Sequence, residues 1–296
     1  MILKVVEMKI NEIMKSPVVT CGENDTIARV RNLMLNKNVS RIIIIDRNEK
    51  PIGIITQKDI IRILNKSTPV WRRRSLDSVT VKNYMSKPLI TESPEVDVIN
   101  AVLKLKETGF SSLPIVSGNK LVGILSKTDI VQALPKLLDA RIQVKQFMKT
   151  PVVTAKKTHS IHHIYDLMRE HNISRVVIVE RNSPIGIITA SDLIFVKPKA
   201  LITGLTERGE ALREPEKITR TLSMNLGRVF ILAEEIMSKD PIVVSENQSV
   251  LKAAEYMTRY NVSGLPVVDG SPNKILVGII TKRDIINHLA EVYAKK

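Results

Sequence analysis

The chain contains one sequence pattern four times, and this repeat limits its fold more than any other feature. A segment MKSPVVT begins at Met14 and returns as MSKPLIT from Met85 and as MKTPVVT from Met148. A fourth copy, MSKDPIVVS from Met237, carries one extra residue. Repetition at this scale favours four similar units, here called units 1 to 4, over one continuous fold.

Each copy is followed by a segment with the periodicity of an amphipathic helix. Apolar residues recur at positions i, i+3 and i+7, which lie on one face of a helix. These residues are Ile27, Val30 and Met34 in unit 1, Val98, Ala101 and Leu105 in unit 2, Ile161, Ile164 and Met168 in unit 3, and Val250, Ala253 and Met257 in unit 4. We therefore expect one helix here in each unit, with this stripe buried.

Two apolar runs of strand length follow each helix. The first reads RIIIID, SLPIVS, RVVIVE and GLPVVD, and the second reads GIIT, GILS, GIIT and GIIT. Near-continuous apolar runs indicate strands that are buried on both faces. A second helix is predicted after the Thr or Ser, so each unit has the order strand, helix, strand, strand, helix. A unit of about 50 residues buries its sheet poorly alone, so we predict two pairs of units.

The predicted fold class is therefore α/β, in the mixed α+β sense. The four βαββα units are placed at 8–66, 79–136, 142–197 and 231–293. The connection at 198–230 is longer than a plain loop should be. Its composition is helical from Ala200 to Leu212 and from Ile218 to Ala233, so added helices are expected there.

Composition argues against several classes of protein. Cys21 is the only cysteine, which excludes an internal disulfide and a Cys-rich zinc site. No apolar run approaches the ~20 residues of a membrane span, and the first residues lack the apolar core of a secretory signal. We therefore expect a cytoplasmic protein without a membrane span.

Motifs for catalysis and for metal binding are missing from the sequence. There is no GxSxG, HExxH or Walker A pattern and no pair of catalytic carboxylates, so we do not expect an enzyme. His159, His162 and His163 lack a nearby acid and are interpreted as surface residues, so no metal is expected.

The chain is strongly basic, with 45 Lys and Arg against 30 Asp and Glu and a formal charge of +15. Such an excess attracts anions, which include phosphate ligands, nucleic acid and membrane surfaces. The densest basic cluster is WRRR, from Trp71 to Arg74. Nucleic-acid binding is thus an alternative function, but it is not favoured, because 3% aromatic residues supply no stacking platform for single strands.

The repeated pattern resembles the cystathionine β-synthase (CBS) domain, two copies of which associate as a Bateman module. The residues that carry the resemblance are the initial PhhT segment, the helix, the hhPhh strand and GhhTxxD, four times in register. Four tandem copies resemble the γ regulatory subunit of AMP-activated protein kinase and its archaeal relatives. The resemblance implies a disc of four units that senses an adenine nucleotide (AMP, ADP or ATP) in clefts between paired sheets. It also implies an unknown regulated protein and a possible homodimer. A further alternative is a structural or regulatory subunit that binds S-adenosyl compounds.

The GhhTxxD segments supply candidate ligand-binding side chains. A carboxylate has two acceptor oxygens and can receive both hydroxyls of a ribose diol, the role that the family gives to this acid. A hydroxyl at a helix start can help to hold a phosphate. The acids are Asp59, Asp129, Asp192 and Asp284, and the hydroxyls are those of Thr56, Ser126, Thr189 and Thr281. The same spacing also forms a helix capping box, and both roles can coexist.

Candidate phosphate-binding residues alternate along the chain. By resemblance they lie at the start of the middle strand, where units 1 and 3 have Ser40–Arg41 and Ser174–Arg175, and a guanidinium suits phosphate. Units 2 and 4 have Ser111–Ser112 and Ser263–Gly264 instead, so the clefts are predicted to be unequal. Basic residues before the acid, Lys58 and Arg283, are further candidates. For adenine the resemblance implies Val19, Ile90, Val153 and Val243, which fit a plain core role equally well.

Overall fold

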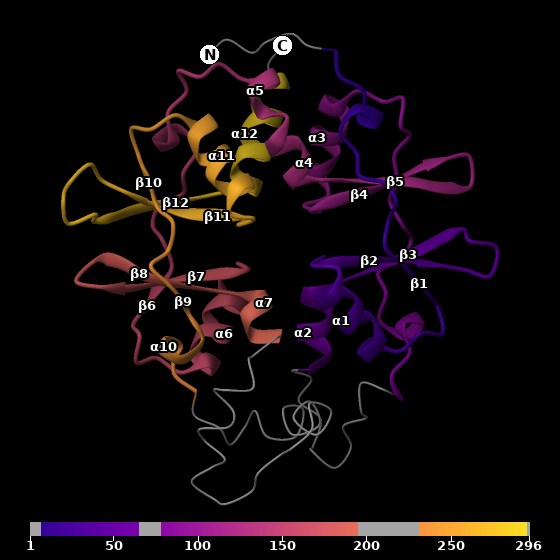
Figure 1. Ribbon diagram of the computed structural model, residues 1–296, viewed down its shortest axis with the longest axis horizontal. Helices are drawn as coiled ribbons and strands as arrows, with labels where there is room; N and C mark the ends of the chain where they lie inside the picture. Colours follow the sequence, from indigo (N-terminus) through magenta and orange to yellow (C-terminus); the bar gives the residue numbers. More distant parts are fainter. Residues whose placement is uncertain (1–6, 65–77, 195–230, 295–296) are drawn as a thin grey trace, which may run out of the picture.

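The computed structural model describes residues 7–64, 78–194 and 231–294. The helices predicted at 200–212 and for most of 218–233 lie outside the described residues, and so does the WRRR cluster. Within the described part, all four units fold as small mixed sheets covered by helices, which confirms the predicted fold class (Figure 1).

Units 1 and 2 follow the predicted order of elements with two differences, both in unit 2: a reduced first strand and the additional helix α5. Unit 1 consists of β1 (Thr20–Gly22), α1 (Ile27–Asn36), β2 (Arg41–Ile45), β3 (Pro51–Thr56) and α2 (Gln57–Leu64). Unit 2 consists of α3 (Val98–Glu107), β4 (Ser112–Ser117), β5 (Lys120–Ser126), α4 (Lys127–Gln132) and α5 (Leu134–Leu137). The first strand predicted for unit 2 is reduced to a single parallel bridge between Glu92 and Ile115.

Units 3 and 4 repeat this arrangement. Unit 3 consists of β6 (Thr154–Ala155), α6 (Ile161–Glu170), β7 (Arg175–Glu180), β8 (Ser183–Thr189) and α7 (Ala190–Ile194). Unit 4 consists of α10 (Ala233–Ile236), β9 (Ser238–Lys239), β10 (Val244–Ser245), α11 (Val250–Arg259), β11 (Gly264–Val268), β12 (Leu276–Thr281) and α12 (Lys282–Tyr293). Units 1 to 3 each begin with a one-turn 3-10 helix, at Ile10–Glu12, Val81–Asn83 and Val144–Gln146.

The predicted helix stripes and middle strands are buried. Every residue of the four i, i+3, i+7 stripes is at most 6% exposed, which confirms the prediction. In the middle strands β2, β4, β7 and β11 at least three consecutive residues are buried, as expected for strands covered on both faces. The first helices start at side-chain caps in units 1, 3 and 4, for example where Arg29 N donates to Thr26 Oγ1.

Units 1 and 2 exchange the segments that precede their first helices. Lys15, in this segment of unit 1, bonds through its backbone to Ile124 in β5 of unit 2, with N–O distances of 2.9 and 3.0 Å. Ser86, in this segment of unit 2, bonds in the same way to Ile54 in β3 of unit 1. Units 3 and 4 repeat the exchange, through Lys149 with β12 and through β9 with β8. The chain therefore forms two modules, units 1 and 2 and units 3 and 4, which confirms the predicted pairing.

The exchange explains two parts of the repeat, the Met that begins it and the Gly of GhhT. In each unit this Gly has no room for a side chain, because the Met of the paired unit occupies the space. A Cβ built at Gly123 would lie 2.5 Å from Met14 Sδ, and one built at Gly53 would lie 2.6 Å from Met85 Sδ. Met148 and Met237 fill the same space at Gly278 and Gly186.

The two modules meet through helices at the centre of the molecule. In Figure 1 the units occupy four quadrants, with α12, α3 and α4 gathered above the centre and α2 and α7 below it. Units 2 and 4 share one continuous core, to which both α4 and α12 contribute, whereas units 1 and 3 have separate cores. Units 1 and 3 are joined by a hydrogen bond of 2.7 Å from Ser191 Oγ to Gln57 Oε1.

We predict that Gly123→Ala destabilises the protein by about 1–3 kcal/mol, because the new methyl group overlaps Met14 and approaches Lys15 O. Urea unfolding measures the change. Combining it with Met14→Ala should recover part of the loss, since the clash is then removed. Gly270→Ala is the matched control, because a Cβ there meets nothing within 4 Å. If Gly123→Ala and Gly270→Ala changed the free energy of unfolding equally, the packing of Met14 against Gly123 would not be needed for the exchange.

Candidate functional site

The four predicted acids all act as helix caps through one carboxylate oxygen. In unit 2, Asp129 Oδ2 accepts from Ser126 N at 2.7 Å and from Ser126 Oγ at 2.6 Å. The same pair of bonds links Asp59 to Thr56, Asp192 to Thr189 and Asp284 to Thr281. The full capping box is formed in units 2 and 4, and the bonds to the acid are present in all four units. Each hydroxyl commits its only proton to the acid, so it cannot donate to a phosphate while this bond lasts.

The second oxygen of Asp129 and of Asp284 is the unusual feature of these caps. Both side chains are almost completely buried, at 2% and 3% exposure. Neither Oδ1 accepts a hydrogen bond, although each lies near a lysine that follows the Met of the repeat. Lys15 Nζ is 3.3 Å from Asp129 Oδ1, and Lys149 Nζ is 3.2 Å from Asp284 Oδ1, which are ion-pair distances without hydrogen-bond geometry. These lysines are 62% and 61% exposed, so a ligand can displace them at little cost.

The predicted arginines bring further positive charge to the same two acids. Burial lowers the pKa of Arg41 to about 10, and the charge of Asp129 acts in the opposite direction. Arg175 has the same lowered pKa of about 10 from burial, and Asp284 is its opposing charge. Both residues are partly exposed as a whole, but each NH1 is shielded from solvent and has no hydrogen-bond partner. A buried N–H without an acceptor is costly and marks a position where an anion would fit.

Two lysines that were not among the predicted site residues complete the cluster. Lys127 and Lys282 directly follow the capping Ser or Thr of units 2 and 4, and each is only 6% exposed. Burial, together with nearby cations, lowers the pKa of both from 10.5 to about 8. The missed signal is that units 2 and 4 have Lys at this position, where units 1 and 3 have Gln57 and Ala190.

The predicted inequality of the units has a clear structural form. Asp129 is surrounded by Lys15, Arg41 and Lys282, and Asp284 by Lys149, Arg175 and Lys127. We call these two groups the Asp129 cluster and the Asp284 cluster. In units 1 and 3 Gln57 and Ala190 stand at the positions of these lysines, and Ser191 donates to Gln57 between the two units. A buried lysine thus follows the capping residue in units 2 and 4 but not in units 1 and 3.

The remaining predicted residues take simpler positions. Ser40 Oγ accepts from Arg41 NH2 at 2.8 Å, and its carbonyl accepts from Gln57 N. The carbonyl of Ser174 accepts from Ala190 N in the same way. Lys58 is exposed, and Arg283 donates to Gly109 O at 3.5 Å. The four predicted adenine contacts, Val19, Ile90, Val153 and Val243, are all partly buried.

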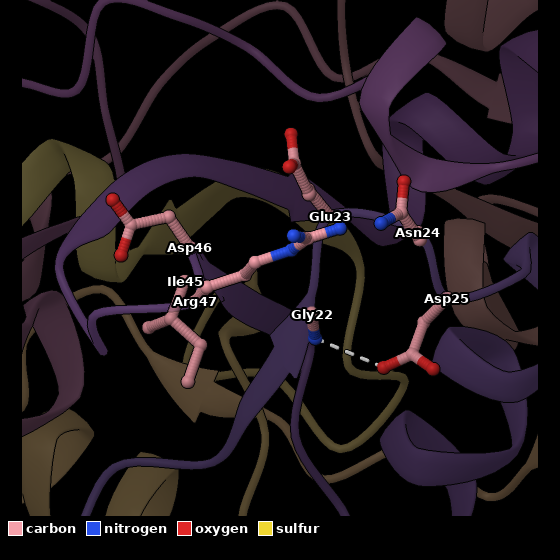
Figure 2. A pocket seen from close by; sticks show the side chains of 7 residues that line it. All are labelled: Gly22, Glu23, Asn24, Asp25, Ile45, Asp46 and Arg47. Carbon is pink, nitrogen blue, oxygen red and sulfur yellow. Dashed lines mark hydrogen bonds between the residues drawn. The ribbon is translucent and has the colours of Figure 1, made fainter.

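A pocket of about 280 Å³ lies away from these clusters, at the ends of β1 and β2 in unit 1 (Figure 2). Its lining includes Asp25, which accepts from Gly22 N at 2.9 Å and pairs with Arg29. None of the predicted site residues lines it. We therefore assign the candidate site to the two clusters rather than to this pocket.

Two other features bear on function. Among the helices of residues 7–64, 78–194 and 231–294, none is long and apolar enough to cross a membrane. In the same part of the chain no three His, Cys, Asp or Glu side chains are grouped to hold a metal ion. The rings of His159 and His163 contact each other edge to face, with 4.5 Å between their centroids.

Known proteins with similar sequences include two archaeal proteins. An uncharacterized protein of Methanocaldococcus jannaschii, MJ1225, is 25% identical over 283 residues, which are 92% of this chain and 95% of that protein. An uncharacterized protein of Methanopyrus kandleri is 29% identical over 133 residues, which are 44% of this chain and 65% of that protein.

Solved structures share the fold over nearly the whole chain. The crystal structure of MJ1225, which has been proposed as an archaeal homologue of γ-AMPK, gives a TM-score of 0.79 at 23% identity and covers 96% of this chain and 100% of that one. An uncharacterized conserved protein of Pyrococcus horikoshii gives a TM-score of 0.62 at 18% identity, with 95% of this chain and 100% of that chain covered.

The family model of the CBS domain matches residues 10–66, 81–136, 144–199 and 233–291. The matched segments contain the exchanged strands, the capped closing helices and both cationic clusters. The chain therefore belongs to the CBS domain family, with four copies of the domain arranged as two modules.

Proposed function

We propose that this protein is a regulatory sensor that binds adenine nucleotides at the Asp129 and Asp284 clusters and transmits their occupancy to a partner protein. One observation carries the proposal: in each cluster a buried lysine and a partly exposed arginine, both with lowered pKa, act on a single acid that is almost completely buried. Keeping such charges in the folded protein without a compensating opposite charge costs free energy. A bound polyanion provides that compensation.

The arrangement fits both parts of a nucleotide. The free Oδ1 of Asp129 or Asp284 can accept from ribose hydroxyls once the exposed Lys15 or Lys149 moves aside. The shielded NH1 groups of Arg41 and Arg175 can then donate to phosphate oxygens. The cations and the ribose acceptor thus favour a phosphorylated nucleoside over S-adenosyl compounds, which carry no phosphate.

Adenine is the base that the CBS family favours, and the proposed relation of MJ1225 to γ-AMPK agrees with it. In this chain the base would lie against the apolar residues that precede or begin the first strand, Val19, Ile90, Val153 and Val243. Asp59 and Asp192, whose units have Gln57 and Ala190 in place of Lys127 and Lys282, would bind a nucleoside or nothing. The nucleic-acid alternative depends on Trp71–Arg74, which lie outside the described residues, and no feature of the described part favours it.

A regulatory output follows from where the clusters lie. Each contains side chains from both units of one module and from the other module, so a ligand there touches the contacts that set their relative arrangement. A ligand shifts such an arrangement only through its different affinities for the alternatives. Phosphate number is the property that these cations would distinguish, which suits a sensor of AMP, ADP and ATP.

We predict that Asp129→Asn and Asp284→Asn each remove one ATP-binding site in isothermal titration calorimetry of the full chain. Asparagine keeps an oxygen for the cap, but it replaces the ribose acceptor by an N–H donor. The affinity of the altered site should fall at least tenfold. Asp166→Asn, on the outer surface of α6, is the matched control. The proposed function is wrong if the parent protein binds none of AMP, ADP and ATP, or if both variants bind like the parent.

We also predict that Lys127→Met together with Lys282→Met stabilises the ligand-free protein at pH 7, by about 1–3 kcal/mol per site. The folded pKa of about 8 lies below the ordinary value of 10.5, so the folded state holds fewer protons than the unfolded state between these values. The cost of the lysines is therefore full below pH 8 and declines as the pH rises toward 10.5.

Urea unfolding from pH 6 to pH 10 measures this effect. The advantage of the double variant should be constant up to about pH 7.5 and should shrink above pH 8. Lys120→Met, an exposed lysine at the start of β5, should change stability little at any pH. An advantage that stays constant to pH 10 would contradict the lowered pKa values.

A further inference from the structure

The lysines Lys127 and Lys282 lie where the two modules pack against each other. They are the first residues of α4 and α12, and these helices are in contact across the interface between units 2 and 4. Their backbone N–H groups donate to Ser111 O and Ser263 O, both at 3.1 Å, which fixes where each side chain leaves its helix. Both side chains are buried, so neither can turn away into solvent.

Contacts place Lys282 beside the acid of the other module. Its Nζ donates to Thr128 Oγ1 at 3.0 Å, and Thr128 directly precedes Asp129. The charges that act on its pKa are those of Arg175, Asp129, Lys15 and Arg41. The acid in this set is Asp129 of unit 2, not Asp284, which lies two residues away in its own helix.

Lys127 shows the reciprocal relation. The charges that act on its pKa are those of Arg283, Arg41, Asp284 and Lys58. The only acid among them is Asp284 of unit 4, although Asp129 is two residues away along the chain. Each lysine thus follows the capping residue of one cluster in sequence, whereas the acid whose charge acts on it belongs to the other cluster.

We propose that Lys127 and Lys282 are exchanged between the modules, so that each completes the phosphate-binding site of the module to which it does not belong. This inference rests on the proposed function and adds to it that neither site is complete within one module. A phosphate at the Asp129 cluster binds Lys282 of unit 4, and a phosphate at the Asp284 cluster binds Lys127 of unit 2. Ligand binding therefore joins the modules directly.

The test uses the full chain with one cluster disabled at a time. Asp284→Asn leaves the Asp129 cluster as the ATP site, and Asp129→Asn leaves the Asp284 cluster. Lys282→Met and Lys127→Met are introduced separately into each background, and ATP binding is measured by calorimetry. Methionine keeps the length of the side chain and removes its charge, and thermal melting verifies that each variant is folded.

Lys282→Met should weaken ATP binding about tenfold when only the Asp129 cluster is active, and less than about threefold when only the Asp284 cluster is active. Lys127→Met should show the opposite pattern. Lys282→Arg, which keeps the charge, should retain most of the affinity. Lys120→Met should change neither background.

The inference is overturned if each lysine affects only the cluster of its own unit, or both clusters equally, or neither. In these cases the parent still binds ATP and each Asp→Asn variant still removes one site, so the proposed function stands. If the parent chain bound none of AMP, ADP and ATP, the proposed function would instead be rejected. The two failures are therefore distinguished by the parent and the single Asp→Asn variants alone.

Discussion

The exchange of leading segments is the constraint on which the rest of the molecule depends. The GhhT strand of each unit has an edge without a partner in its own unit. Its backbone groups are paired by the segment that begins with Met in the paired unit. The Met of that segment fills the space that Gly leaves free. The same segment also delivers the residue that follows the Met to the capping acid of its neighbour. That residue is Lys15 beside Asp129 and Lys149 beside Asp284.

The inequality of the four acids follows from this geometry and from few residues. In the segments that reach unit 2 and unit 4, the residue after the Met is lysine, whereas Ser86 and Ser238 stand there in the other two segments. Arg41 and Arg175 come from the same units as the two lysines. Each module thus brings the lysine that follows its first Met and its arginine to one of its own acids, Asp129 or Asp284, whereas Lys127 and Lys282 act on the acid of the other module.

The sequence was sufficient to predict the main helices and strands, though not the loss of the first strand in unit 2, nor which residues from different units meet. Periodicity identified the buried stripes, such as Ile27, Val30 and Met34, because a helix that buries one face has an apolar residue on that face in every turn. The four acids were identified from their spacing, and the cap was predicted as one of their roles. Gly123 was read only as part of a motif, because its partner Met14 lies more than 100 residues away in the chain. Lys127 was missed for the same reason: its burial depends on the packing of α4 against α12.

The shared core of units 2 and 4 explains why the charge at the centre persists. Leu125 and Ile130 of unit 2 pack in one cluster with Ile280 and Ile285 of unit 4, so separating these units would expose buried apolar surface. The positive charges of Lys127 and Lys282 therefore cannot be relieved by opening the interface. Two routes remain: loss of a proton, toward which the lowered pKa values already tend, or the arrival of an anion. Near neutral pH the lysines keep their protons, so a bound anion would lower the free energy of this interface.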